Sequence, residues 1–574
     1  MKILFYHYES KLYDKVLYSG MSVFAKSTSL YLKTYLDIKK PGVAKQIEWC
    51  VPQQLKLNDS DLIQLINTKK PNILATTHYI WNYRELLKQL ERIKPLIDPN
   101  IVILAGGPSV DVNVNPDYFK DYNFIDYAFY GPGEKAFAGF IESLVNNTPL
   151  DKTKLTNMAW PDSNRNAIVA DYEYVPQLKT SPYLHSKELL KDIVDDMNAQ
   201  DLSPIISYEL TRGCPYTCTF CDWNSGFGNK TTRRKESYKD EIDLFQELGV
   251  TGLFLADANL GQYQEDVDMI EYFADRNINH GAKFKLDYTV SKLRKDNNLK
   301  IFHSMAKANL CTHFVISVQD TNDQVLEYID RPDVGWDVHR KHITALAKEY
   351  PHIPSVVQII QGLPGQTVDS FRKSLLDVVS VHAMPFIYVN ELVPASPAAR
   401  SQEYKDVWNF EYSDALRWDY MGKDEFRSPF SMTCKSFTKE DFLEMTLLSL
   451  IYTAIGHYIV YTVDKQFKNI DFNVDKIVDE FLASENYYIL KDNLWNNWQH
   501  HNKFYWTSDM DGSHVDEYLT ACSMPVCDLV PRVNNNQSFL KWTLKHLSPT
   551  TDDHAKKEYA KFIIEQVKTK WYEQ

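Results

Sequence analysis

Positive charge is in short supply in this chain of 574 residues. It has 63 lysines and arginines against 76 aspartates and glutamates, a formal net charge of -13 at pH 7. Proteins that bind the backbone of nucleic acids need a basic surface. The composition therefore argues against a general nucleic-acid binder and, with 13% aromatic residues, favours a small molecule or peptide as the partner.

A long uninterrupted apolar run is also missing. The first ten residues hold one lysine and a short apolar stretch that soon turns polar, so we expect a β-strand and neither a signal peptide nor an anchor. The most hydrophobic segment, 442–463, predicts a buried helix capped by Thr438 and Asp441 rather than a membrane span. Its interruptions are Glu444, Thr446, Ser449, Thr453, Gly456 and His457.

Cysteine is sparse, with eight residues in the chain. In a long chain without a secretory signal, cysteines are expected to be thiols or metal ligands in the reducing cytosol rather than disulfides. We therefore expect a cytoplasmic protein. The eight are Cys50, Cys214, Cys218, Cys221, Cys311, Cys434, Cys522 and Cys527.

Short apolar runs alternate with amphipathic stretches in the first 150 residues. This pattern predicts an α/β domain with a doubly wound (Rossmann-like) parallel sheet, whose ligands bind beyond the carboxyl ends of the strands. The loops expected there are 76–79, 106–109 and 131–134. The predicted strands are Ile3–Tyr6, Gln46–Val51, Ile73–Thr77, Ile101–Ala105 and Tyr127–Tyr130, and the predicted helices are Trp81–Ile93 and Glu134–Leu144.

Three further segments follow this domain. Residues 151–200 have weak periodicity and several prolines, as a linker would. Residues 201–400 resume the alternation with six predicted strands, which suit a (βα)6 partial barrel, and residues 401–574 are expected to form a mainly helical domain. The six strands are Ile205–Leu210, Gly252–Ala256, Lys283–Tyr288, His313–Val318, Ser355–Ile360 and Phe386–Leu392.

Three cysteines stand close together just after the first strand of the barrel segment. Cys214, Cys218 and Cys221 can ligate three irons of one [4Fe-4S] cubane, because thiolates are the ligands such clusters require. The fourth iron then lacks a protein ligand and is open to substrate. A zinc knuckle is the alternative, but it needs a fourth cysteine or histidine nearby, and the next histidine is His280.

This arrangement resembles the radical S-adenosylmethionine (SAM) superfamily, in which a Cys-x3-Cys-x2-Cys loop follows the first strand of a partial barrel. The resemblance implies that the open iron binds SAM. Taken singly, an aspartate after a strand is more often a helix cap and a Gly-Leu-Pro-Gly segment is more often only a turn. Their order after the cysteines favours SAM contacts from Phe220, Asp257, Ser317, Gln319, Gly362 and Pro364.

The N-terminal domain resembles the cobalamin-binding domain that precedes the barrel in B12-dependent radical SAM enzymes. Glycines at a strand-to-helix turn let a backbone approach a large ligand closely. The alternative is that this domain has kept the fold and lost the cofactor. The cobalamin contacts that the resemblance implies are Thr76, Thr77, His78, Tyr79, Trp81, Gly106, Gly107, Pro108, Gly131, Gly133 and Glu134.

One motif of many cobalamin proteins is missing. Nothing here matches the Asp-x-His-x-x-Gly sequence whose histidine ligates cobalt, so His7 is not assigned as a ligand. The loop that contains Tyr79 and Trp81 is the candidate for covering the lower face of the corrin ring. As an alternative, Trp81 only packs a helix against the sheet.

The resemblance implies methyl transfer through methylcobalamin to an unactivated carbon or phosphorus centre, with a second SAM cleaved to a 5′-deoxyadenosyl radical. It also implies a low-potential electron donor such as flavodoxin or ferredoxin. A rearrangement or cyclisation without methyl transfer, a cobalamin-free radical SAM enzyme and an iron–sulfur binding protein stay as alternatives. A methylthiotransferase is disfavoured, because only Cys50 precedes Cys214 and a second cluster would need three cysteines.

The C-terminal region is expected to cap the barrel and select the substrate. Its aromatic stretch 495–506 suits a pocket or, more commonly, a core. Cys522 and Cys527 are too few for a second cluster unless Cys434 joins them. The segment 509–512 lacks the closing glutamate of a calcium loop and is discounted.

Overall fold

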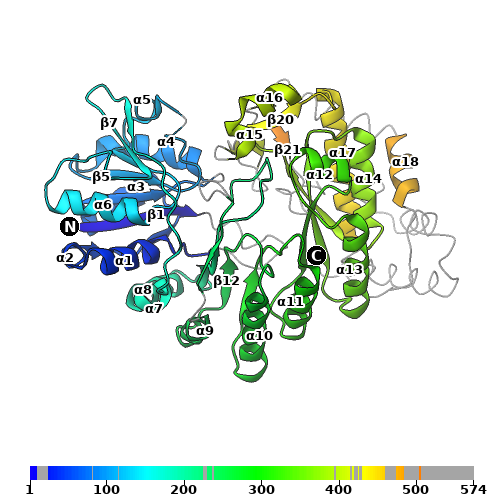
Figure 1. The fold of residues 1–574 in the computed structure, drawn as a ribbon, viewed down its shortest axis with the longest axis horizontal. Coiled ribbons are helices and arrows are strands. Elements are labelled where there is room, and N and C mark those ends of the chain that lie inside the picture. The colour runs from blue at the N-terminus through cyan, green and yellow to red at the C-terminus, as the bar shows by residue number, and fades with distance from the viewer. Residues whose placement is uncertain are drawn as a thin grey trace, which may run out of the picture. The chain divides into compact units, whose positions relative to one another are not determined.

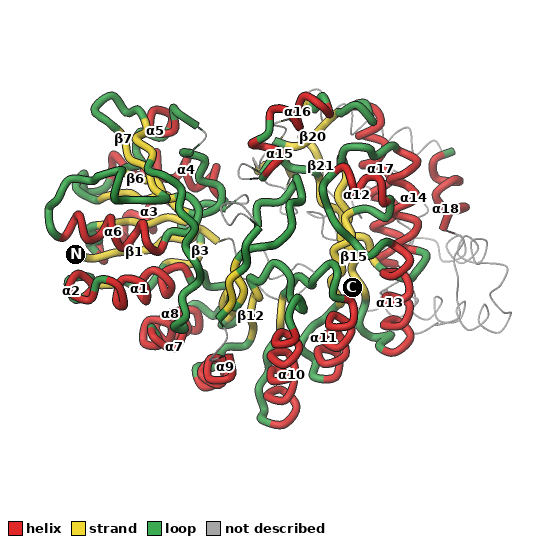
Figure 2. Tube along the Cα trace, viewed as in Figure 1, coloured by secondary structure: helices red, strands yellow, loops and turns green. Residues whose placement is uncertain are grey.

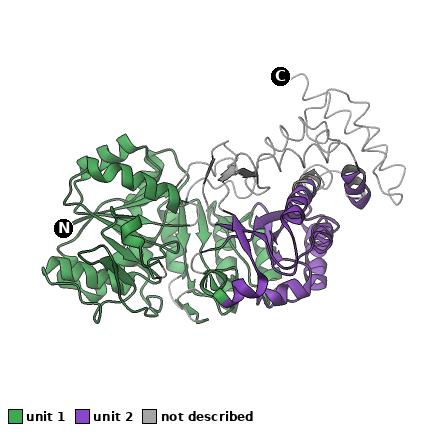
Figure 3. Ribbon diagram, turned by 90° about the horizontal axis from the view of Figure 1, so that it is seen from above, with its two compact units in different colours: residues 1–311, 392–402 green, residues 312–391, 403–574 purple. Residues whose placement is uncertain are grey.

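In a computed structural model of the chain, two compact units are distinguished (Figure 3). Unit 1 comprises Met1–Cys311 and Leu392–Gln402, and unit 2 comprises Thr312–Glu391 and Glu403–Gln574. No helix among the described residues is long and apolar enough to span a bilayer. The structure describes residues 1–9, 24–79, 82–113, 115–223, 229–234, 238–393, 396–413, 416–418, 424–425, 429–458, 474–483 and 503–505.

An eight-stranded sheet forms the N-terminal part of unit 1. Its order is β2-β1-β4-β5-β6-β7-β8, and β3 also pairs with β1. Strands β1 to β6 pair in parallel, which confirms the predicted doubly wound sheet, whereas β7 and β8 are antiparallel additions. The strands are β1 (Lys2–Glu9), β2 (Glu48–Trp49), β3 (Gln53–Leu55), β4 (Ile73–Thr77), β5 (Val102–Gly106), β6 (Tyr127–Phe129), β7 (Met158–Pro161) and β8 (Ala167–Val169).

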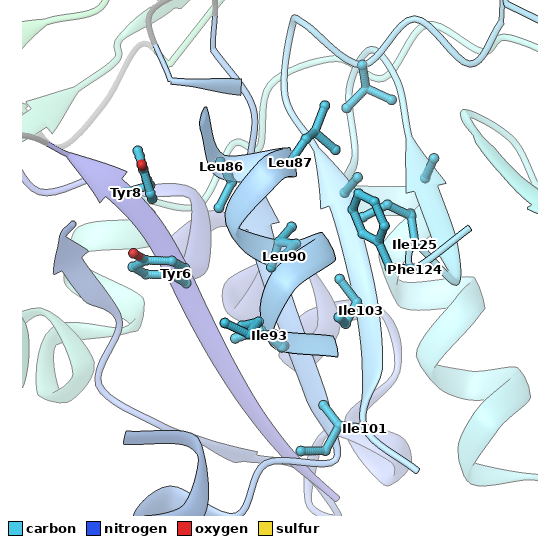
Figure 4. Packing of buried hydrophobic residues seen from close by; sticks show 14 of the residues in the cluster. Tyr6, Tyr8, Leu86, Leu87, Leu90, Ile93, Ile101, Ile103, Phe124 and Ile125 are labelled. Atoms are coloured by element: carbon cyan, nitrogen blue, oxygen red, sulfur yellow. The ribbon is translucent and has the colours of Figure 1, made fainter. Parts of the chain in front are cut away.

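Helices cover both faces of this sheet (Figure 1). Successive side chains of a strand point to opposite faces, so Tyr6 of β1 lies on the face covered by α4 (Figure 4), in a cluster that also includes residues of α3 and α5. Phe5 lies on the other face, in a cluster with residues of α1, α2 and α6. Burial on both faces explains why β1 is almost continuously apolar. The helices are α1 (Thr28–Lys39), α2 (Pro41–Ala44), α3 (Asp59–Lys69), α4 (Tyr83–Ile93), α5 (Tyr118–Asp121) and α6 (Glu134–Val145).

The segment 151–200, which was interpreted as a linker, contains regular structure. Strands β7 and β8 extend the N-terminal sheet, and helices α7 (Pro182–His185) and α8 (Lys187–Ala199) follow. The ring of Tyr183 in α7 packs edge-on against Tyr31 in α1, with centroids 6.1 Å apart. This part of the chain is therefore built onto the sheet domain.

A second parallel sheet of unit 1 has the order β13-β12-β9 and is flanked by a row of helices α9, α10 and α11 (Figure 2). Ala25 forms a single parallel β-bridge with strand β9 of this sheet. Its N–H donates to Ile205 O at 2.7 Å, and its carbonyl accepts from Ser207 N at 3.0 Å. The elements are β9 (Ile205–Tyr208), β12 (Gly252–Leu255), β13 (Lys285–Asp287), α9 (Tyr238–Glu247), α10 (Gln264–Asn279) and α11 (Lys295–Lys307).

Unit 2 contains the remaining three strands predicted for 201–400, as a parallel sheet of order β14-β15-β16. Helix α17 (Lys439–Tyr458) confirms the buried helix expected at 442–463, and Thr438 and Asp441 cap it reciprocally. The sheet elements are β14 (Phe314–Gln319), α12 (Asp323–Tyr328), α13 (Trp336–Glu349), β15 (Ser355–Gln361), α14 (Val368–Val379) and β16 (Met384–Val389).

The described residues beyond 401 have most of their regular structure in helices, consistent with the expected mainly helical domain, and they also include five short strands. Strands β17 and β20 pair with each other, and β18 pairs with β19 and β21. The elements are α16 (Gln402–Trp408), β17 (Glu411–Ser413), β18 (Leu416–Trp418), β19 (Asp424–Glu425), β20 (Phe430–Thr433), α18 (Val474–Leu482) and β21 (Lys503–Tyr505).

Candidate active site

The three clustered cysteines lie in a loop of unit 1 that opens after strand β10 (Thr211–Arg212). Strand β10 pairs antiparallel with β11 (Thr232–Arg233), which closes the base of the loop. Cys214 and Cys218 are 7% and 4% exposed, whereas Cys221 is partly exposed. Three thiols are thus presented from one short, anchored segment.

Side-chain nitrogens donate to two of these sulfurs. Asn259 Nδ2 donates to Cys214 Sγ at 3.2 Å, and Lys292 Nζ donates to Cys218 Sγ at 2.8 Å. Burial raises the pKa of the Cys221 thiol to about 12, and the negative charge of the nearby Asp222 contributes to this rise. A metal that binds this sulfur must displace its proton.

Among the residues that the structure describes, no three His, Cys, Asp or Glu side chains gather closely enough to hold one metal ion. A mononuclear zinc knuckle therefore has no preformed ligand set in this part of the chain. A cubane places each thiolate on a different iron, so its three ligands need not converge on a point. Two buried thiols with side-chain N–H donors and a third, partly exposed thiol fit such a cluster.

Asp257, predicted to meet SAM, is bonded to the backbone. Its two carboxylate oxygens accept from Leu210 N at 2.8 Å and Thr211 N at 2.9 Å. Burial, reinforced by the charge of Asp266, raises its pKa to about 7. Asp257 therefore braces the strand end that leads to Cys214, and a contact with SAM stays a prediction. Phe220, the other candidate here, is partly exposed between Cys218 and Cys221.

Asn259 was not predicted as a site residue. It is 8% exposed, and its Oδ1 has no hydrogen-bond partner among the described residues, although Nδ2 contacts Cys214. Buried polar atoms normally have a partner, and an exception calls for an explanation such as a ligand. The available signal was its place two residues after Asp257, beyond the end of β12.

The predicted cobalamin residues lie at the carboxyl edge of the N-terminal sheet. The chain turns in opposite directions after β1 and β4, which are neighbours, so the switch point of the sheet lies between them. His7 of β1 and Thr77 of β4 share a hydrogen bond there, Nδ1 to Oγ1, at 3.0 Å. Ligands of doubly wound sheets bind at this place.

The loops after β4 and β5 lie against each other. His78 N donates to Gly106 O at 2.7 Å, and Ser109 N donates to His78 O at 3.1 Å. Gly107 has φ +113°, and a Cβ on it would stand 2.6 Å from His78 O. Close packing against the His78 backbone therefore requires glycine at position 107, whether or not a ligand also approaches this turn. Pro108 next to it is exposed.

Several polar groups of the 76–79 loop are engaged within the protein. Thr76 Oγ1 donates to Leu104 O at 2.7 Å and contacts His78 Nε2 at 2.9 Å. Burial lowers the pKa of His7 and His78 to about 3, so both rings are neutral. On the neighbouring strand β1, His7 Nε2 is buried and has no hydrogen-bond partner among the described residues. This orphaned atom at the switch point fits a bound polar ligand.

A buried ion pair lies at the same edge. Lys26 and Glu9 are 2.9 Å apart, with side chains 3% and 6% exposed. The Lys26 ammonium stands 3.6 Å from the ring centroid of Phe24 and 4.6 Å from that of Tyr79. Phe24 in turn stacks on Phe254 of β12 at 4.4 Å. These contacts connect Tyr79, a predicted cobalamin contact, to strand β12 of the second sheet.

Glu134, predicted to contact cobalamin, pairs with Arg212 beside the cysteine loop. Arg212 Nη1 donates to Glu134 Oε1 at 2.6 Å, and the same guanidinium pairs with Glu209 at 2.9 Å. Gly131 and Gly133 precede Glu134, and Gly131 has φ +68°. The structure thus brings the 131–134 turn next to the base of the loop that carries Cys214.

The SAM candidates of unit 2 occupy the ends of β14 and β15. Gln319 has φ +73° and is 8% exposed, and its Oε1 has no partner among the described residues. Gly362 has φ +85°, and its N–H donates to Gln366 Oε1 at 2.8 Å. Pro364 is buried in the same turn, and Ser317 contacts Gln358. Backbone strain and a buried amide oxygen without a described partner, as at Gln319, are typical of a functional position.

Other candidates fall outside the described residues. These are Trp81, Cys522, Cys527, the 509–512 segment and the aromatic stretch 495–506 except 503–505. Cys434 is described and lies 3.1 Å from Ser436 Oγ.

Residues 208–378 match the radical SAM superfamily. The chain is 28% identical over 333 residues to the "Cobalamin-dependent radical SAM methyltransferase TokK" of Streptomyces tokunonensis, covering 57% of this chain and 48% of the relative. It is 27% identical over 388 residues to the "2-(S-pantetheinyl)-carbapenam-3-carboxylate methyltransferase" of Streptantibioticus cattleyicolor, covering 67% and 56%. The chain thus spans about half the length of these relatives.

Two solved structures share the fold. The "Cobalamin-dependent S-adenosylmethionine radical enzyme OxsB" has a TM-score of 0.54 at 13% identity, covering 99% of this chain and 80% of that one. The "radical S-adenosylmethionine methyltransferase, TsrM" from Kitasatospora setae also has a TM-score of 0.54, at 12% identity, covering 79% and 94%. The predicted resemblance is confirmed: residues 208–378 form a radical SAM domain, and the chain has the fold of cobalamin-dependent radical SAM enzymes.

Proposed function

We propose that this chain is a cobalamin-dependent radical SAM enzyme that methylates an unactivated carbon or phosphorus of a small molecule or peptide. The observation that carries the proposal is the Arg212–Glu134 ion pair, which joins the three-cysteine loop to the edge of the sheet where cobalamin is predicted. Both relatives described above are named as methyltransferases, and one as cobalamin-dependent.

Cys214, Cys218 and Cys221 would hold the [4Fe-4S] cluster. When bound, the cluster would supply the electron that cleaves SAM, and cobalamin would carry the methyl group. In unit 1, the orphaned Oδ1 of Asn259 is suited to accept from the SAM ammonium group. In unit 2, the resemblance assigns SAM contacts to Ser317, Gln319, Gly362 and Pro364.

The carboxyl edge of the N-terminal sheet would hold cobalamin. His7 Nε2 offers one hydrogen-bonding atom to its polar groups, and the loops 76–79, 106–108 and 131–134 would form the walls. The buried groups of Thr76 and His78 bond within the protein, so these residues would contribute backbone and shape rather than a cobalt ligand. Because the cofactors carry the difficult chemistry, the protein's work is binding, orientation and exclusion of water.

The test is anaerobic purification of the full chain from cells supplied with cobalamin, followed by measurement of iron, sulfide and corrinoid. We expect four irons and one corrinoid per chain, and formation of 5′-deoxyadenosine or S-adenosylhomocysteine from SAM with a low-potential donor such as flavodoxin, ferredoxin or dithionite. Replacement of Cys214, Cys218 and Cys221 by alanine should abolish the iron. Iron without corrinoid would refute the cobalamin half of the proposal.

With a substrate in hand, S-adenosylhomocysteine separates methyl transfer from rearrangement. Methyl transfer forms it in proportion to product, whereas a rearrangement or cyclisation forms none.

A further inference from the structure

Lys292 stands directly against one of the three thiols. It follows β13, and its Nζ lies 2.8 Å from Cys218 Sγ and 4.2 Å from the ring centroid of Tyr216. Tyr216 is itself part of the loop, between Cys214 and Cys218. The ammonium group is therefore held between a sulfur and an aromatic face, two partners that both favour positive charge.

Among the described residues, the other side-chain N–H donor to these cysteines is neutral. Asn259 Nδ2 reaches Cys214 Sγ at 3.2 Å. Lys292 differs because it brings a full charge to the sulfur, and it is only partly exposed, so solvent screens that charge incompletely. Arg294, the next basic residue of the segment, is exposed.

A positive charge at a cluster sulfur has a direct electrostatic consequence. A [4Fe-4S] cluster with three thiolate ligands is negatively charged when oxidised, and the incoming electron adds one further negative charge. An ammonium group stabilises the reduced form more than the oxidised form, and hydrogen bonds to sulfur act in the same direction. The reduction potential of the cluster therefore rises.

We propose that Lys292 is a positioning residue that sets the reduction potential of the cluster on Cys214, Cys218 and Cys221, and so eases one-electron transfer from a low-potential donor. This inference rests on the proposed function, because it requires the cluster. In the step concerned, the donor loses one electron and the cluster gains it.

Three single variants of the full chain test this inference. Lys292→Met removes the charge and keeps a long side chain, and Lys292→Arg keeps the charge. Lys300→Met removes the same charge from an exposed position of α11. Each protein is reconstituted anaerobically, its iron and sulfide are measured, and the cluster is titrated with dithionite under EPR in the absence of SAM.

We expect Lys292→Met to retain wild-type iron and to show a midpoint potential shifted to more negative values. Lys292→Arg should lie closer to the wild type, and Lys300→Met should match it. SAM binding by the oxidised proteins, measured by equilibrium dialysis, should change by less than the tenfold that loss of a direct charged contact would produce.

Two outcomes would overturn the inference. An unchanged potential in Lys292→Met, with SAM affinity reduced, would make Lys292 a SAM contact. Equal loss of iron in Lys292→Met and Lys292→Arg would make it a structural residue. Absence of any cluster in the wild-type protein would instead refute the proposed function, so the two failures are distinguishable.

Discussion

Arg212 Nη1 donates to Glu134 Oε1 at 2.6 Å, although the two residues are 78 positions apart in the chain. Arg212 is followed directly by Gly213 and Cys214, and Glu134 is the first residue of α6 after the Gly131-Pro132-Gly133 turn. The Arg212 and Glu134 side chains are 10% and 6% exposed. A buried charge pair thus fixes the cysteine loop to the sheet edge where cobalamin is predicted.

Replacing Glu134 by glutamine should destabilise unit 1. The variant leaves Arg212 buried with Glu209 as its remaining carboxylate, so we expect the free energy of unfolding to fall by about 1–3 kcal/mol. Urea denaturation measures the change. Lys135→Met, which removes the exposed partner of Glu173, is the control and should cost less than about 1 kcal/mol. Equal effects of the two variants would contradict a structural role for the buried pair.

Much of the fold was predictable, because the spacing of apolar residues along the chain and the glycines that follow strands are local signals. Every strand predicted in the first 150 residues is present, and so are all six of the barrel segment. Strands β7 and β8 were missed because they are only four and three residues long, and one contains Pro161. Such short strands depend on an existing sheet edge, which a sequence window does not show.

The cysteine triad was predictable from spacing alone, whereas its surroundings were not. Lys292 and Asn259 approach Cys218 and Cys214 from different strand ends, across gaps of 74 and 45 residues. A lysine or asparagine after a strand is common at surfaces, so neither residue type marks a site. Only the fold brings these donors to the sulfurs.

Gly107→Ala should disturb the sheet edge where Gly106→Ala does not. The new Cβ at position 107 would meet the His78 backbone at 2.6 Å and would carry a left-handed φ, whereas at position 106 its nearest neighbour is 3.8 Å away. We expect Gly107→Ala to lose about 1–3 kcal/mol of stability and most corrinoid binding. Thermal unfolding and corrinoid absorbance report the two effects. Similar stability of both variants would show that the close contact with His78 is not maintained.

Asp257 should make stability depend on pH. Burial raises its pKa from 3.8 to about 7, so the folded state holds a proton that the unfolded state releases. The stabilisation is complete below pH 3.8 and is lost as the pH rises through 7. We expect the free energy of unfolding of the wild type, relative to Asp257→Asn, to fall by about 2 kcal/mol between pH 5 and pH 7.

Urea denaturation of both proteins across this range measures the difference. Asparagine has no proton to release, so its fixed effect on the bonds to Leu210 and Thr211 cancels in the comparison of slopes. Parallel pH profiles would show that Asp257 keeps an ordinary pKa in the folded protein.

Gln319 combines backbone strain with a buried amide oxygen that has no partner among the described residues, and two variants separate these properties. Gln319→Gly removes the cost of φ +73°, so we expect it to be about 1 kcal/mol more stable than Gln319→Ala, which keeps the strain. Both variants remove the orphaned Oε1, so both should bind SAM about tenfold more weakly than the wild type, the value of one good hydrogen bond. Urea denaturation and equilibrium dialysis with the reconstituted protein give the two quantities. Equal stability of the variants would show an unstrained backbone, and wild-type affinity for SAM in Gln319→Ala would remove Gln319 from the site.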